Sequence, residues 1–224
     1  MPKSVLVKAE PEPVEIDLER TGIVVIDVQN TFVSKGGMFD LWGENTEHNR
    51  KIIPIIQKII AAARKAGCKI VYTRQIFSPD LRETGGPDSV HWSRGYPLVY
   101  RTRPELRDKL AFPGTWGYEI IEEVKPEAND LIVDKPKFSG FFGTNLDTNL
   151  KTFNLKYLIF TGLATNFCVE STIRDAYYEQ YWPILISDAC ANSGPPFTQE
   201  ATLWNVKHLL GWVTTSENLL QVLR

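Results

Sequence analysis

The sequence predicts an α/β protein, a three-layer αβα sandwich around a central, mostly parallel sheet of six strands. Short apolar runs rich in β-branched residues alternate with segments of helical spacing along the whole chain. The apolar runs are continuous, as in strands that are buried on both faces of a parallel sheet. At 224 residues the chain has the length of one such domain. We therefore expect an N-terminal arm over residues 1–20 and a single domain over residues 21–224.

The first half of the chain opens with a segment rich in Pro, Glu and Lys, residues 1–20, which predicts an extended arm. Residues 22–26 (GIVVI) are rich in β-branched side chains and predict the first strand, which ends at Asp27. Isoleucine and alanine side chains recur at helical spacing over residues 50–65, and a glycine follows as a stop signal. Residues 68–73 then predict the second strand.

Residues 75–117 are the least regular part of the chain. Connections of this length are uncommon unless they are functional or carry small elements of their own. We expect an excursion over a pocket, with a short helix near residues 104–110 and one more short helix or strand over residues 118–124.

The second half alternates strictly between strand and helix patterns. The expected strands cover residues 130–134, 157–161, 183–186 and 211–213. The expected helices cover residues 144–153, 168–180, 197–210 and 216–223.

Composition narrows the class of protein. The net charge of −2 argues against a nucleic-acid surface, which normally needs a basic face. No apolar run has membrane-spanning length, and the first residues lack the apolar core of a signal peptide. Three cysteines are too few for a disulfide framework, so we expect a reducing, cytoplasmic location.

Three residues whose side chains could take part in catalysis follow predicted strands: Asp27, Lys135 and Cys168. Ligands of open α/β sheets bind at the carboxyl ends of the strands, so these side chains are expected at one edge. Individually they have ordinary alternatives as a turn residue, a solvated lysine and a buried small side chain. Together they suit nucleophilic catalysis, with a thiolate favoured by the N–H groups of a helix start, a carboxylate that takes its proton and a stabilising ammonium.

Cys190 is a second cysteine near the same edge. It lacks the turn into a helix that surrounds Cys168, and Ser-Gly-Pro-Pro follows shortly after it. We expect it to be structural, because nothing around it favours a thiolate.

Motifs around the three candidates resemble the isochorismatase-like cysteine hydrolases. They are residues 26–30 (IDVQN), 135–142 (KPKFSGFF) and 161–172 (TGLATNFCVEST), and the resemblance covers roughly residues 20–215. Residues 84–87 (TGGP) and 211–213 (GWV) are similar to the ureidoacrylate amidohydrolase branch. The resemblance implies a Rossmann-like sheet and hydrolysis of a small molecule.

The resemblance also implies roles. Asp27 would be the general base and acid, Lys135 the charge-stabilising lysine, with Lys137 as a nearby competitor, and Cys168 the nucleophile. The peptide Leu163–Ala164 would be cis, and the N–H groups of Ala164 and Cys168 would form an oxyanion hole.

The function implied is a cysteine-dependent amidohydrolase that cleaves the C–N bond of a small ureido or carbamoyl compound, such as ureidoacrylate, through a covalent thioester. A biuret or N-carbamoyl amino acid hydrolase with the same mechanism is an alternative, since Thr73-Arg74 is more like the biuret hydrolases. A vinyl-ether hydrolase of the isochorismatase type and a catalytically silent protein of this fold are further alternatives, and the intact Cys168 and its partners weigh against both.

A substrate with a ureido group and a carboxylate needs amide-type partners at one end and a cation at the other. Candidates for the ureido end are Asn30, Gln75 and Gln199, and candidates for the acid end are Arg74 and Arg94. Candidates for the walls are Phe32, Trp92, Phe138 and Phe141.

The three histidines, His48, His91 and His208, show no metal-ligand spacing, so we expect no catalytic metal and no cofactor. His91 could belong to the pocket. The partners expected are the small substrate and, by resemblance, other copies of the chain in a dimer or tetramer, with no nucleic acid and no membrane.

Overall fold

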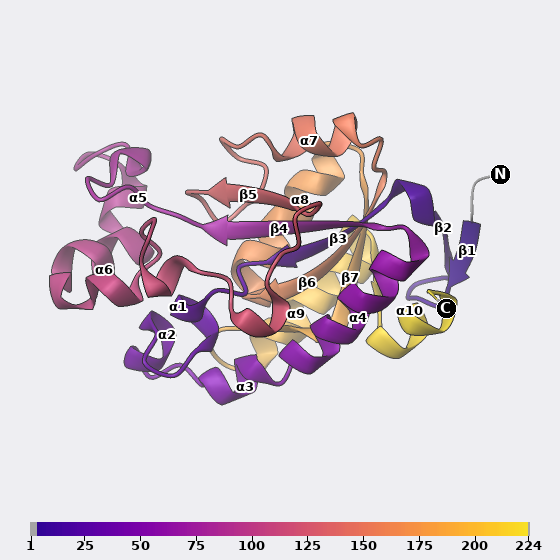
Figure 1. The fold of residues 1–224 in the computed structure, drawn as a ribbon, viewed down its shortest axis with the longest axis horizontal. Helices are drawn as coiled ribbons and strands as arrows, with labels where there is room; N and C mark the ends of the chain where they lie inside the picture. The colour runs from indigo at the N-terminus through magenta and orange to yellow at the C-terminus, as the bar shows by residue number, and fades with distance from the viewer. Residues whose placement is uncertain (1–3, 224) are drawn as a thin grey trace.

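The computed structural model describes residues 4–223, and a sheet of six strands runs through its middle (Figure 1). The strand order is β5-β4-β3-β6-β7-β8, and every neighbouring pair is parallel. The predicted fold class is confirmed, with a sheet that is parallel throughout. The bounds are β3 Thr21–Ile26, β4 Lys69–Gln75, β5 Leu131–Lys135, β6 Tyr157–Leu163, β7 Trp182–Ala191 and β8 Trp212–Thr214.

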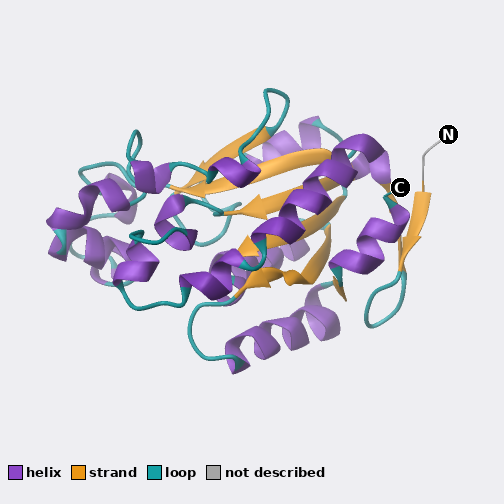
Figure 2. Ribbon diagram, turned by 60° about the horizontal axis from the view of Figure 1, so that its bottom comes forward, coloured by secondary structure: helices purple, strands orange, loops and turns teal. Residues whose placement is uncertain are grey.

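Helices cover both faces of the sheet (Figure 2). The helices α4 (Ile53–Ala66) and α10 (Ser216–Val222) lie on one face. The helices α7 (Leu146–Thr152), α8 (Glu170–Tyr178) and α9 (Phe197–Asn205) lie on the other. Side chains of β3 alternate between the two cores, which is why all six of its residues are apolar or small and buried.

The helix α4 follows directly from its sequence. Four of its isoleucines, Ile53, Ile56, Ile59 and Ile60, are buried, and Pro54 lies in the first turn, where the missing N–H costs nothing. Gly67 ends the helix with φ of 86°, a conformation that a side chain would strain.

The remaining helices are short. They follow the carboxyl ends of β3 and β4, the edge of the sheet where the candidate catalytic residues lie. They are α1 Asn30–Val33, α2 Met38–Leu41, α3 Thr46–Arg50, α5 Val90–Ser93 and α6 Tyr96–Thr102. The 3-10 turns are Leu18–Arg20, Arg82–Thr84, Pro104–Lys109, Trp116–Tyr118 and Glu122–Val124.

The structure departs from the sequence prediction in three helical or strand bounds. The strand β7 continues past residue 186 to Ala191, after a register shift against β6. The expected helix over 168–180 begins instead with a π-helical turn, Thr165–Val169, that leads into α8. A second π-helical turn, Val206–Leu210, ends the segment that begins with α9.

The N-terminal arm is a hairpin in its described part, not a single extended segment. The strands β1 (Ser4–Val7) and β2 (Val14–Asp17) pair antiparallel. Its buried side chains join the core on the α10 face, namely Val7, Val14 and Ile16. The first three residues of the expected arm lie outside the described residues.

The hairpin also contacts the last strand of the sheet. Glu10 N–H donates to Val213 O (2.8 Å), and Val213 N–H donates to Glu10 O (2.9 Å). Thr214 Oγ1 donates to Lys8 O (2.6 Å). The tip of the hairpin is therefore hydrogen-bonded to β8.

Within residues 4–223, none of the helices has both the length and the apolar character that crossing a membrane would require.

Candidate active site

The structure brings the three candidate catalytic side chains together at the carboxyl edge of the sheet. Asp27 follows β3, Lys135 ends β5, and Cys168 lies in the turn after β6. Lys135 Nζ lies 2.7 Å from Asp27 Oδ2. The exposed fractions of the three residues are 1%, 0% and 1%. A buried ion pair next to a buried thiol is the centre of the site.

Asp27 is held from two sides. Thr73 Oγ1 donates a hydrogen bond to Asp27 Oδ1 (3.0 Å), and the backbone N–H of Asp27 donates to Thr73 O (3.1 Å). Asp27 has a φ of 51°, in the left-handed region that only a few per cent of non-glycine residues adopt. Such conformations persist where the surrounding structure enforces them, and they cluster at functional sites.

Lys135 is completely buried, and its ammonium has two neutral acceptors and one carboxylate as polar partners. Its Nζ donates to Gln75 Oε1 (3.2 Å) and to Lys137 O (3.1 Å), besides the pair with Asp27. Burial alone would lower the pKa of the ammonium, but the charges of Asp27 and Cys168 outweigh it and raise the pKa. The ammonium form of Lys135 is therefore favoured at the site.

Cys168 lies in the π-helical turn Thr165–Val169. Burial raises the pKa of its thiol; the Lys135 ammonium opposes this effect, and the Asp27 carboxylate adds to it. This shift opposes the resting thiolate that the sequence predicts for the turn, because burial disfavours the charged form of the thiol. The resting thiol carries its proton, next to a carboxylate that can take it.

The backbone before Cys168 approaches β3 closely. Gly162 has φ of 110°, and a Cβ at this position would lie 2.1 Å from Ile26 O. Glycine is thus the residue that fits there. The following peptide, Leu163–Ala164, is cis, as the resemblance implied.

Aromatic side chains close the site. Tyr96, the first residue of α6, contacts Phe32 (ring centroids 5.4 Å apart) and Phe138 (5.8 Å), and Phe138 stacks on Phe167 (5.7 Å). Burial raises the pKa of the Tyr96 hydroxyl, and Cys168 and Asp27 raise it further when they are ionised. A neutral hydroxyl therefore belongs to the surroundings of the triad.

Tyr96 was missed by the sequence reasoning. It lies in the irregular excursion, where no periodicity marks a residue as buried. Phe32, Phe138 and Gln75, which were predicted, do lie beside the triad or in its aromatic cover.

The other predicted substrate-binding residues contact partners elsewhere. Asn30 donates to Trp116 O, Arg74 pairs with Asp134, Arg101 lies over the Trp92 ring, Phe141 packs on Tyr181, and Gln199 donates to Ser187 O and Cys190 O. Arg74 also stacks on Tyr118. These contacts are structural, and none of them reaches Asp27, Lys135 or Cys168. Arg94 is exposed.

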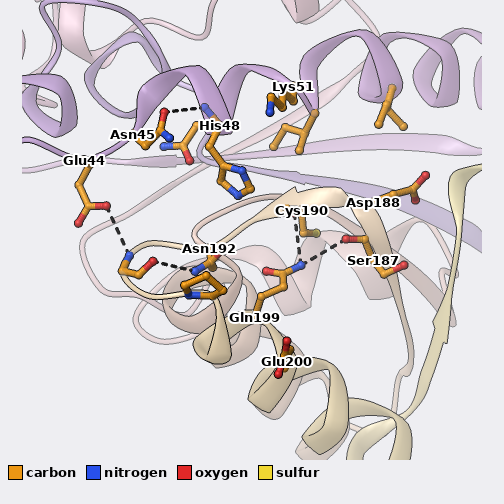
Figure 3. A pocket seen from close by; sticks show the side chains of 15 residues that line it. Glu44, Asn45, His48, Lys51, Ser187, Asp188, Cys190, Asn192, Gln199 and Glu200 are labelled. Carbon is orange, nitrogen blue, oxygen red and sulfur yellow. Dashed lines mark hydrogen bonds between the residues drawn. The ribbon is translucent and has the colours of Figure 1, made fainter.

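A cavity of about 610 Å³ lies between α3, the start of α4 and the end of β7 (Figure 3). Its lining includes His48, Glu44, Cys190 and Gln199, but no member of the triad. Figure 3 shows the Gln199 amide directed at Cys190 and Ser187. Cys190 Sγ contacts Phe160 O (3.7 Å), and burial raises the pKa of its thiol.

The histidines lie apart from one another. His48 lines the cavity, His91 contacts Lys137, and His208 stacks on Trp204. Over residues 4–223, no three His, Cys, Asp or Glu side chains gather in a way that could hold a metal ion.

A family model described as the isochorismatase domain matches residues 21–218. The chain belongs to the isochorismatase family. As a member of it, the chain is 40% identical over 212 residues to ureidoacrylate amidohydrolase RutB of Methylorubrum extorquens (strain DSM 6343 / CIP 106787 / DM4), covering 94% of this chain and 86% of that one. The family resemblance of the motifs is thereby confirmed.

Solved structures agree with this assignment to the isochorismatase family. A cysteine hydrolase from Pseudomonas syringae pv. phaseolicola 1448A has a TM-score of 0.77 at 29% identity, covering 93% of this chain and 94% of that one. N-carbamoylsarcosine amidase from Thermoplasma acidophilum has a TM-score of 0.66 at 25% identity, covering 88% and 97%. Together with the sequence relatives, these similarities make the chain an amidohydrolase of this family, acting on C–N bonds other than peptide bonds.

Proposed function

We propose that this amidohydrolase cleaves the ureido C–N bond of a small ureido or carbamoyl compound of the ureidoacrylate type, through a thioester on Cys168. The observation that carries the proposal is the buried Lys135–Asp27 ion pair, 2.7 Å long, with the Cys168 thiol in its field. The relatives named ureidoacrylate amidohydrolase support the substrate class.

The first half of the reaction begins with a proton transfer. Cys168 gives its proton to Asp27, and the sulfur attacks the ureido carbonyl carbon. Lys135 stabilises the thiolate during this step, because it is a buried cation in contact with both groups. The oxyanion accepts hydrogen bonds from the N–H groups of Ala164 and Cys168, and removal of one such donor typically costs about 3 kcal/mol of transition-state stabilisation.

The second half releases both products. Asp27 returns the proton to the leaving nitrogen, the C–N bond breaks, and the amine departs. The carbamoyl group stays on Cys168 as a thioester. A water molecule then gives a proton to Asp27 and attacks the carbonyl carbon, the sulfur leaves and takes the proton back, and carbamate is released, which decomposes to ammonia and carbon dioxide.

The test measures ammonia release from ureidoacrylate, biuret, N-carbamoyl amino acids, nicotinamide and simple amides. We expect the largest kcat/KM with a ureido or carbamoyl compound, and a carbamoyl group on Cys168 by mass spectrometry after rapid quenching. Cys168→Ala is expected to abolish release, whereas the matched variant Cys190→Ala keeps it, since Cys190 lies in β7 and its thiol donates to the Phe160 carbonyl of β6.

Two outcomes would contradict the proposal. Near-normal turnover by Cys168→Ala would remove the covalent route. No release from any member of the panel by the wild-type chain would remove the substrate class.

A further inference from the structure

Lys137 lies two residues beyond the catalytic lysine and is tied to it. Its carbonyl oxygen accepts the hydrogen bond from Lys135 Nζ (3.1 Å). Its side chain turns to the excursion, where Nζ donates to Glu83 O (3.2 Å) and lies 2.5 Å from His91 Nδ1. Lys137 thus connects the triad to the segment that covers it.

The pair formed by Lys137 and His91 has no anion of its own. The Glu83 carboxylate, the negative charge that acts on Lys137, accepts hydrogen bonds from Ser78 N–H (3.2 and 3.1 Å). In the part of the chain that the structure describes, no carboxylate forms an ion pair with Lys137. Because lysine only donates, His91 Nδ1 must accept, which leaves its Nε2–H as a second donor.

Lys137 and His91 are both half-buried, which makes their charged forms less favourable without a nearby anion. Burial lowers the pKa of Lys137, and burial together with the Lys137 charge lowers the pKa of His91. Burial disfavours the charged forms of both basic groups in the free protein. A bound anion would stabilise these charged forms. The pair is therefore prepared to receive an anion.

The pair flanks the aromatic cover of the triad. Phe138, the next residue after Lys137, stacks on Phe167, which directly precedes Cys168. Tyr96 follows shortly after His91 and packs edge-on against Phe138 (5.8 Å). The two segments that carry Lys137 and His91 are thus the segments whose aromatic side chains cover Cys168.

Arg74, the other candidate partner for a substrate carboxylate near the strand ends, already pairs with an aspartate. Arg74 Nε and one terminal nitrogen donate to the two carboxylate oxygens of Asp134 (2.8 and 3.1 Å), and its guanidinium stacks on the Tyr118 ring. A bidentate pair of this kind leaves little capacity for a substrate carboxylate.

We propose that Lys137 and His91 bind the carboxylate of the substrate and thereby select ureido acids over neutral ureido compounds. This inference rests on the proposed function, since it concerns the acid end of the molecule whose ureido end Cys168 attacks. In this proposal Lys137 donates a charge-assisted hydrogen bond to one oxygen, and His91 donates a second from Nε2–H.

The test compares ureidoacrylate with its primary amide, which differs only at the acid end. Binding is measured by calorimetry to Cys168→Ala, so that no turnover is needed. We expect Lys137→Met in this background to weaken ureidoacrylate about 10- to 100-fold, the range of a hydrogen bond to a charged group, and to change amide binding less than threefold. His91→Phe should show a smaller loss in the same direction, and Lys137→Arg should restore part of the affinity.

The matched control is Lys156→Met, because Lys156 lies over the Trp182 ring at the opposite end of the sheet. It should leave both affinities unchanged. Equal losses for acid and amide in Lys137→Met, or no loss for either, would overturn the carboxylate site. If the binding difference holds but wild-type chain releases no ammonia, the proposed function falls while the carboxylate site stands.

Discussion

Thr73 Oγ1 donates a hydrogen bond to Asp27 Oδ1 (3.0 Å), on the carboxylate whose other oxygen faces Lys135. We expect Thr73→Val, which keeps the shape and removes the donor, to lower kcat about tenfold with KM nearly unchanged, since a hydrogen bond to a charged group contributes about 1.5 kcal/mol or more. Thr161→Val is the control, because Thr161 is also a buried threonine, on β6, and its hydroxyl donates to Val24 O instead of to Asp27. Wild-type kcat in Thr73→Val would contradict the positioning role, and Thr73→Ser should recover activity.

The Lys135–Asp27 pair predicts a strong coupling in stability. Lys135→Met leaves a buried carboxylate without its cation, which should lower the free energy of unfolding by about 3–5 kcal/mol. The double variant Asp27→Asn/Lys135→Met should be far less destabilised than the sum of the single variants. Urea denaturation of the four proteins measures this cycle. Additive losses would mean that the two charges do not stabilise each other.

Tyr96 and Tyr100 lie on the same helix and differ in what their hydroxyls contact. We expect Tyr96→Phe to lower kcat/KM about tenfold with little change in stability, because its hydroxyl is in the electrostatic field of Cys168 and Asp27. Tyr100→Phe should keep activity and lose about 1 kcal/mol of stability, because Ala111 N–H loses its acceptor (3.0 Å). The reverse pattern in steady-state kinetics and denaturation would contradict both roles.

Asn166 fastens the nucleophile turn to the loop after β7. Its side chain donates to Ser193 O (3.0 Å) and accepts from Ser193 N–H (3.0 Å). Asn166→Ala should lower the melting temperature by about 4–8 °C, equivalent to about 2 kcal/mol, and should also lower kcat. Asn192→Ala, which loses contacts within the same loop, should lower the melting temperature alone. Full activity of Asn166→Ala would show that the turn holds its shape without this contact.

Stability should fall at alkaline pH. Burial raises the pKa of the Cys190 thiol and of the Tyr100 hydroxyl, so the native state keeps these protons while the unfolded state loses them. The free energy of unfolding therefore decreases once the pH exceeds the unfolded pKa values, about 8.5 for Cys and 10 for Tyr, by up to about 1.4 kcal/mol per pH unit and group. Urea denaturation from pH 7 to 10.5 measures the slope, which Cys190→Ala should reduce. A constant free energy over this range would contradict the prediction.

The central strands could be located from the sequence to within two residues. Buried parallel strands are continuous apolar runs, and β3, β4 and β6 have no competing pattern. The strand β7 could not, because Ser187 and Asp188 resemble a strand end, and the strand continues through a register shift that depends on β6. The sequence of β7 alone carries no information about the register shift in its pairing with β6.

The parts of the site at strand ends could also be predicted, since topology alone places them together. The side chains that close the site could not. Arg74 looked free in the sequence, but sheet register sets it beside Asp134, 60 residues away. Tyr96 lies in a segment without periodicity, and only the packing of Phe138 against it shows its place. The charge state of Cys168 depends on burial, which the turn motif does not encode.

The hydrogen bonds between Glu10 and Val213 protect the molecule against self-association at one margin of the sheet. The strand β8 is an outermost strand, and an exposed row of backbone donors and acceptors there would invite pairing with another chain. Two of these groups are taken by the N-terminal hairpin, together with the Lys8–Thr214 contact. A chain shortened from its N-terminus through Glu10 would expose these groups. We expect such a chain to aggregate during refolding more than to lose catalytic activity.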